Sequence, residues 1–125
     1  MSARDDICNL IAAYAQALDD GRNAEVVATF TLDGTFEIVG TSTHSGADEL
    51  RAAYDSWTPQ VPQRHVVTNT FVYEASDTAA RATTDFVFMV NGGKGWLTAA
   101  VGRYDDELVN ANGEWKFRHR RVTFV

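Results

Sequence analysis

The sequence predicts an α+β fold, with helices from the first part of the chain on one face of a curved antiparallel sheet. Apolar residues recur at helical spacing near the N-terminus. After Arg64, four long segments are rich in Val, Thr, Phe, Tyr and Trp, residues that favour strands. Only short turns separate these segments, so neighbouring strands should pair antiparallel. Helices followed by a meander of strands are typical of α+β domains.

A long amphipathic helix is predicted from about Ser2 to Asp20. Ser2 can cap its start and Gly21 suits its exit. A line of small residues along this helix leads up to Asp19, so another element can approach closely beneath that carboxylate. The apolar stripe of the helix consists of Ile7, Leu10, Ile11, Tyr14 and Leu18.

Shorter elements are predicted between this helix and Arg64. Asn23 is a plausible cap for the first of them, and two prolines end the last. In chain order they are a helix from Ala24 to Phe30, a turn at Asp33-Gly34, a strand from Thr35 to Val39, a polar connection from Thr41 to Gly46, and a helix from Asp48 to Ser56.

The meander is predicted to contain four strands. The three breaks between them are rich in Asn, Asp, Gly and Ser, which have turn chemistry. The strands run from His65 to Glu74, from Ala79 to Val90, from Gly95 to Val109 and from Glu114 to Val125.

Length, charge and composition narrow the classes of function. A chain of 125 residues is expected to form one domain, residues 1–125. Its net charge of −6 argues against nucleic acid or an anionic membrane as a partner. With one cysteine, Cys8, no signal-peptide pattern and no apolar segment of membrane-spanning length, the expected location is cytoplasmic. Metal-ligand spacings and phosphate-binding motifs are absent, so no metal and no cofactor are expected.

His65 is the first candidate for chemistry. Imidazole has an unperturbed pKa near neutrality and commonly transfers protons. Alternation along the strand predicts that His65, Val67, Asn69 and Phe71 share one face. The alternative is a structural histidine whose hydrogen bonds are satisfied within the core.

Asp19 is the predicted partner of His65. A carboxylate in the last turn of a helix opposes the helix dipole, at a cost of about 0.3–1 kcal/mol, so a compensating partner is expected. A histidine within reach would be oriented by it. The alternative is that Asp19-Asp20-Gly21 is a solvated turn.

A tyrosine and an arginine could assist. Tyr14 lies on the apolar stripe, and its hydroxyl needs a partner if it is buried. Residues 118–121 form a basic run that a strand would divide between its two faces. One arginine facing inward could stabilise an anion or an oxyanion.

Several short motifs resemble those of the SnoaL-like branch of the nuclear-transport-factor-like (NTF2-like) superfamily. The resemblance is to the branch that contains scytalone dehydratase, the bile-acid dehydratases and lindane dehydrochlorinase. The motifs are Ala17-Leu18-Asp19, Phe36-Glu37-Ile38-Val39-Gly40 followed by Gly46, His65-x-x-Thr68-Asn69, Gly102-Arg103-Tyr104 and Gly113-Glu114-Trp115-Lys116-Phe117.

This resemblance implies a cone-shaped antiparallel sheet wrapped around the N-terminal helices, with an internal pocket. The acid/base pair of the branch falls on Asp19 and His65, its helix tyrosine on Tyr14 and its arginine on Arg120. A second pocket histidine, present in scytalone dehydratase, would fall near Thr83, which puts a mechanism with two histidines in doubt. The acidic positions of ketosteroid isomerase fall near Ile38 and Gly102, so that activity is not expected.

The sequence therefore favours a cofactor-independent lyase, such as a dehydratase, or an isomerase. Its substrate should be a small hydrophobic cyclic molecule. The residues predicted to contact it are Trp57, Asn69, Phe71, Phe86, Phe88, Met89 and Trp96. The alternatives are a non-catalytic small-molecule-binding or assembly module, a polyketide-cyclase-like protein, and an accessory subunit of an oxygenase.

A homo-oligomer is also predicted. Apolar residues occur on both faces of the strand between Ala82 and Val90, so the outer face of the sheet should be covered by another subunit. The resemblance favours a trimer over a dimer.

Overall fold

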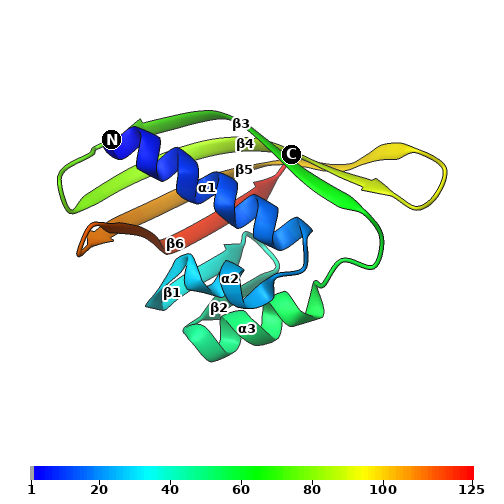
Figure 1. The fold of residues 1–125 in the computed structure, drawn as a ribbon, viewed down its shortest axis with the longest axis horizontal. Helices are drawn as coiled ribbons and strands as arrows, with labels where there is room; N and C mark the ends of the chain where they lie inside the picture. Colours follow the sequence, from blue (N-terminus) through cyan, green and yellow to red (C-terminus); the bar gives the residue numbers. More distant parts are fainter. Residues whose placement is uncertain (1) are drawn as a thin grey trace.

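The computed structural model describes residues 2–125, which form three helices and one six-stranded sheet (Figure 1). The α+β fold class is confirmed. No helix within residues 2–125 is long and apolar enough to cross a membrane. In chain order the elements are α1 (Ala3–Asp19), α2 (Asn23–Ala28), β1 (Phe30–Ile38), β2 (Ser42–Ser45), α3 (Ala47–Ser56), β3 (Gln63–Tyr73), β4 (Ala79–Asn91), β5 (Trp96–Ala111) and β6 (Glu114–Phe124).

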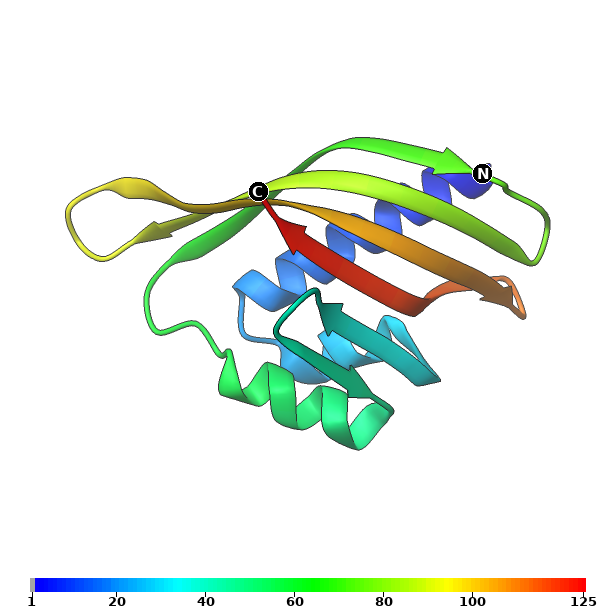
Figure 2. The ribbon, with the colours of Figure 1, turned by 180° about the vertical axis from the view of Figure 1, so that it is seen from behind.

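The sheet has the strand order β2-β1-β6-β5-β4-β3 and is curved without closing into a barrel (Figures 1 and 2). α1 lies across its concave face, and α2 and α3 lie beside β1 and β2. The predicted antiparallel meander is present from β3 to β6. One pair was not expected: β1 runs parallel to β6. After α3 the chain starts the meander at the far edge of the sheet, so its last strand returns beside β1.

α1 forms as its caps and apolar spacing predict. The Ser2 hydroxyl accepts a hydrogen bond from the backbone N–H of Asp5 at 3.1 Å. The helix exits through Gly21, which has a φ of 72° that glycine adopts without strain. The buried stripe of α1 includes Ile7, Ile11, Tyr14 and Leu18, packed toward the concave face of the sheet.

The segment that follows α1 differs from the prediction. α2 ends at Ala28, and Phe30 starts β1 instead of finishing the helix. Asn23 does not cap α2, because its side-chain amide donates to Asp55 Oδ1 and Thr58 Oγ1 of the α3 region, at 3.0 Å and 2.9 Å. This tertiary contact engages the N–H₂ group of the amide, whereas Oδ1, the atom that would accept in a cap, has no partner within residues 2–125.

The region around β1 contains two further differences. Asp33-Gly34 is not a turn but an irregularity within β1, where the pairing with β6 shifts register. A Cβ on Gly34 would lie 3.0 Å from the Phe30 Cβ and 3.1 Å from the Phe117 carbonyl oxygen, so the close strand approach requires glycine. The predicted polar connection contains the short strand β2, which pairs antiparallel with β1.

A β-bulge in β3 decides which of its side chains reach the interior. Between Thr68 and Phe71 the pairing with β4 shifts register, and Asn69 has a φ of 55°. The prediction that Asn69 and Phe71 share the inner face with His65 is therefore wrong. Phe71 is 64% exposed, and Asn69 is exposed and donates to Asp85 Oδ2 at 3.1 Å.

Candidate active site

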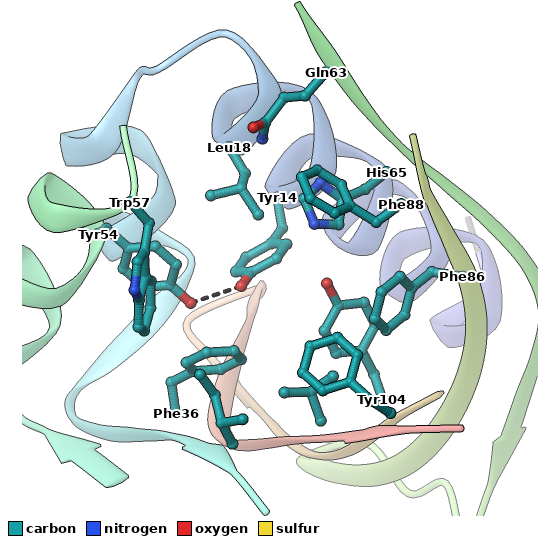
Figure 3. A pocket seen from close by; sticks show the side chains of 13 residues that line it. Tyr14, Leu18, Phe36, Tyr54, Trp57, Gln63, His65, Phe86, Phe88 and Tyr104 are labelled. Atoms are coloured by element: carbon teal, nitrogen blue, oxygen red, sulfur yellow. Dashed lines mark hydrogen bonds between the residues drawn. The ribbon is translucent and has the colours of Figure 1, made fainter. Parts of the chain in front are cut away.

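An apolar cavity of about 290 Å³ lies between α1, α3 and the concave face of the sheet (Figure 3). Most of its wall is aromatic or aliphatic, and its polar side-chain groups come from three tyrosines, one glutamine, one histidine and one tryptophan. The lining residues are Tyr14, Leu18, Phe36, Ile38, Tyr54, Trp57, Gln63, His65, Phe86, Phe88, Tyr104, Val122 and Phe124. A concave, mostly apolar site with a few polar groups is typical of small-molecule binding.

Asp19, at the end of α1, and His65, at the start of β3, are hydrogen-bonded. Asp19 Oδ1 lies 2.7 Å from His65 Nδ1, and Asp19 Oδ2 accepts from the His65 backbone N–H at 2.7 Å. The amide of Gln63 also donates to Asp19 Oδ1, at 3.1 Å. Both partners are largely buried, with side-chain exposures of 5% for Asp19 and 12% for His65.

These bonds define how the imidazole is presented. An ionised carboxylate only accepts hydrogen bonds, so the pairing requires the proton of a neutral His65 on Nδ1. Nε2 is then the atom that can accept a proton. The ring stacks on Phe88, with centroids 4.4 Å apart and an interplanar angle of 27°, because the two residues are paired across β3 and β4. In Figure 3 the ring of His65 lies over the cavity beside Phe88.

Tyr14 and Tyr54 form a hydroxyl pair in the cavity wall. Their oxygens are 2.6 Å apart, and both side chains are 1% exposed (Figure 3). Burial raises the pKa of Tyr14 to about 12, and it raises the pKa of Tyr54 well above its usual value. Both phenols therefore remain protonated near neutral pH and can donate hydrogen bonds.

Arg120 is the arginine of the 118–121 run that is fully buried. It does not line the cavity but lies beneath it, with the guanidinium carbon 3.5 Å from the ring centroid of Tyr104 and 4.3 Å from that of Tyr14. Directly opposite on β5, Asp106 Oδ1 is 3.1 Å from Arg120 Nε, although the two atoms are not aligned for a hydrogen bond. Arg120 therefore does not contact the cavity, and its predicted direct role at the site does not fit this structure.

The remaining predicted contact residues divide between the two faces of the sheet. Trp57, Phe86 and Phe88 line the cavity. Asn69 and Phe71 point away from it because of the bulge in β3. Met89 alternates with Phe88 and so lies on the outer face, and Trp96 starts β5 at the projecting β4–β5 hairpin, where it is 46% exposed.

Several cavity residues were not among the predicted site residues. Tyr54 lies within the helix predicted from Asp48 to Ser56 but was not singled out for the site, and Tyr104 was named only as part of a motif. Gln63 precedes the predicted start of its strand. Alternation on β5 could have placed Tyr104 inside, but the contact of Tyr54 with Tyr14 depends on how α3 packs. Within residues 2–125, no group of three or more His, Cys, Asp or Glu side chains is placed to hold a metal ion.

The architecture is an NTF2-like, cystatin-like fold, in which helices lie on the concave side of a curved sheet. More specifically, the chain belongs to the SnoaL-like domain family, whose model matches residues 1–121. No curated protein matches the chain.

Solved structures reproduce the fold over nearly the whole chain. A protein of unknown function from Mycobacterium tuberculosis is 25% identical, with a TM-score of 0.91 over 98% of this chain and 71% of that one. An NTF2-like protein with a cystatin-like fold from Novosphingobium aromaticivorans is 19% identical, with a TM-score of 0.87 over 98% and 81%. A candidate scytalone dehydratase from the same organism is 20% identical, with a TM-score of 0.87 over 98% and 83%.

Proposed function

We propose that this protein is a cofactor-independent enzyme of the lyase or isomerase type, which removes a proton from a carbon atom next to a carbonyl group. The observation that carries the proposal is the hydrogen-bonded pair of Asp19 and His65 at an apolar cavity. A histidine whose Nδ1 is held by a carboxylate has Nε2 free to act as a base. SnoaL-like and NTF2-like proteins include dehydratases and polyketide cyclases, which is consistent with this chemistry.

In the first step, His65 Nε2 takes the proton from the carbon, and the electrons of the C–H bond move to the carbonyl oxygen. Asp19 holds the imidazole in place and stabilises the imidazolium that forms. Tyr14 donates a hydrogen bond to the negatively charged oxygen, while Tyr54 donates to the oxygen of Tyr14. Arg120 acts through the rings that it stacks on, and not by contact with the substrate.

The second step distinguishes the two reaction types. In a dehydratase, the enolate electrons form a C=C bond and the neighbouring C–O bond breaks. The departing hydroxide takes the proton from His65 and leaves as water. In an isomerase, the substrate carries a C=C bond next to the carbon that loses the proton. The carbonyl re-forms, this C=C bond shifts by one carbon toward the carbonyl, and His65 returns the proton to the carbon at its former far end. In both reactions the imidazole is regenerated, and no external electron donor or acceptor is consumed.

The cavity limits the substrate to a small, uncharged, ring-sized molecule. Its volume of about 290 Å³ is at the lower end of ligand sites, which usually span about 300–1,000 Å³. Phe86, Phe88 and Trp57 supply flat apolar walls. Within the lining, no Lys, Arg, Asp or Glu is present to balance a charge on the substrate.

Deuterium exchange into α-tetralone tests the proposal, because this ring-sized ketone exchanges the hydrogens next to its carbonyl only through an enol or enolate. The protein should accelerate the exchange in D₂O, measured by NMR. His65→Gln should lower the enzymatic rate by about 10²–10⁴-fold, the usual contribution of a positioned base. His119→Gln is the matched control, since His119 bonds Glu37 and does not line the cavity. An unaltered rate in His65→Gln would rule out His65 as the base.

A non-catalytic binding protein is the second candidate. It is favoured by the predominantly apolar lining and by the mutual hydrogen bond of Tyr14 and Tyr54, which leaves few polar groups for a reaction. In that case α-tetralone would bind without any acceleration of deuterium exchange.

We also propose that the chain forms a homo-oligomer, a trimer rather than a dimer, through the outer face of the sheet. Apolar side chains are exposed there, notably Phe71, which is paired with Thr83 on that face and is 64% exposed. Val66 and Val101 lie on the same face and are 48% and 40% exposed. Light scattering at micromolar concentration should show a mass above that of the monomer.

A further inference from the structure

The hydroxyl of Tyr104 faces the cavity and has no hydrogen-bond partner within residues 2–125. Tyr104, on β5, is only 3% exposed and lines the cavity. Unlike Tyr14 and Tyr54, it makes no hydrogen bond with any group of residues 2–125. In Figure 3 its hydroxyl points to the same central space as the hydroxyl of Tyr14 and the ring of His65. A hydroxyl that faces an apolar cavity and is not engaged by the protein is suited to form a hydrogen bond with a polar atom of a ligand.

The ring that carries this hydroxyl is held on both faces. Phe86 stacks on one side, with centroids 4.6 Å apart and an interplanar angle of 25°. The guanidinium of Arg120 covers the ring 3.5 Å from its centroid. Phe86 in turn needs Gly102, because a Cβ there would lie 2.6 Å from the Phe86 Cζ. The hydroxyl is thus held in place before any ligand arrives.

The surroundings also make this hydroxyl a hydrogen-bond donor. Burial raises the pKa of Tyr104 well above its usual value, so the phenol keeps its proton. A cation over the face of an aromatic ring is attracted to its π-electrons and withdraws density from the ring. The O–H group is polarised as a result and favours an acceptor that gains negative charge.

We infer that Tyr104 is a substrate-binding residue whose hydroxyl donates a hydrogen bond to the carbonyl oxygen of a ring-sized ketone. This inference rests on the proposed function, in which that oxygen becomes negative when His65 takes the proton. It also narrows the substrate class, because a hydrocarbon or a halogenated ring without an oxygen acceptor would leave the Tyr104 hydroxyl without a partner.

A pair of ligands of nearly equal shape tests the inference. α-Tetralone and tetralin differ mainly in the carbonyl oxygen, and the dissociation constants of both are measured by NMR titration. Wild type should prefer α-tetralone, and Tyr104→Phe should reduce that preference about tenfold, the effect expected when one hydrogen bond is lost and a ligand polar group is left unpaired. Tyr73→Phe is the matched control, because this substitution also removes a tyrosine hydroxyl, but at a residue that does not line the cavity.

The outcomes separate this inference from the proposed function. An unchanged preference in Tyr104→Phe, or no binding of either ligand to wild type, would overturn the inference. Loss of tetralin binding along with α-tetralone binding would also overturn it, since Tyr104 would then be a packing residue. If the preference falls as expected but wild type does not accelerate deuterium exchange, the inference stands and the proposed function fails.

Discussion

Two pairs of facing side chains, Asp19 with His65 and Asp106 with Arg120, differ in their access to the cavity. Asp19 and His65 are slightly exposed, and the Asp19 carboxylate accepts three hydrogen bonds. Asp106 and Arg120 have side chains with no exposure at all, and none of their charged atoms is aligned for a hydrogen bond within residues 2–125. Aromatic faces, including those of Tyr14 and Tyr104, surround the guanidinium instead.

Because of this difference, the Asp19–His65 pair is suited to proton transfer, whereas the Asp106–Arg120 pair is suited to stabilising the fold around the cavity. In the first pair, one ring nitrogen is engaged and the other remains available to a molecule in the cavity. In the Asp106–Arg120 pair, neither side chain is exposed to solvent or to the cavity. Arg120 can influence a bound molecule only through the aromatic rings that its guanidinium contacts. Buried charges without hydrogen bonds are costly. Removing one partner of the Asp106–Arg120 pair should therefore lower the free energy of unfolding more than breaking an exposed pair does.

The largest effect is expected from removing the charge of Asp19. Asp19→Asn should lower the α-tetralone exchange rate by about 10²–10⁴-fold, because an amide can neither stabilise the imidazolium nor enforce the same tautomer. The double variant with His65→Gln should be little slower than either single variant, since the two residues act as one unit. Asp20→Asn, at the neighbouring exposed carboxylate, is the control. Multiplicative losses in the double variant would contradict a paired role.

The next largest effect is expected at the buried pair of Asp106 and Arg120. Arg120→Met should lower the free energy of unfolding by about 3–5 kcal/mol, because it leaves Asp106 buried without its cation and removes the contact with three rings. Arg103→Met is the matched control: Arg103 pairs with Asp85 at the surface, where solvent screens the pair and its loss should change stability much less. The free energy of unfolding of each variant is to be measured by urea denaturation. Equal losses of stability in Arg120→Met and Arg103→Met would show that the buried pair contributes no more to stability than the surface pair.

A third test uses pH. Burial raises the pKa of Asp106 from 3.8 to about 7, against the opposing effect of Arg120. A raised pKa means that the folded state binds the proton more tightly, so this contribution to stability is full below pH 3.8 and is lost as the pH rises through about 7. The unfolding free energy of Asp106→Asn minus that of wild type should therefore increase over this interval. A flat difference would show that Asp106 is not perturbed by burial.

The smallest effect is expected from the third donor to Asp19. Gln63→Met keeps the length of the side chain but removes the hydrogen bond to Oδ1, and the exchange rate should fall by about 2–10-fold. Gln60→Met is the control, because Gln60 donates to the Thr58 carbonyl in an exposed loop. A fall as large as that of Asp19→Asn would mean that Gln63 positions the pair on its own.

Elements defined by local patterns were predictable from the sequence. The cap at Ser2 and the exit at Gly21 bound α1 to within one residue. The meander strands were recognisable because turn residues separate segments rich in β-branched and aromatic residues. A carboxylate at the end of a helix and a histidine at the start of a strand indicated the contact between Asp19 and His65, although their catalytic role remains a prediction.

Features that depend on distant contacts were not predictable. An asparagine in a strand resembles any polar residue until its φ of 55° is known, and the bulge there reverses the faces of all later positions in β3. The Tyr14–Tyr54 bond depends on how α3 packs against α2, β1 and β2, and not on any local pattern. The pairing of β1 with β6 joins distant segments, and each strand alone indicates nothing about its partner.

The parallel pairing of β1 with β6 has a consequence for the order in which the protein folds. Contacts between distant segments form slowly, because a long loop must close before they contribute stability. β3 to β6 can assemble through short hairpins, whereas β1 gains its main neighbour only when β6 is in place. The part of the cavity wall that contains Phe36 and Trp57 should therefore form late. Until then, the aromatic side of the nascent cavity is open to water and to other chains.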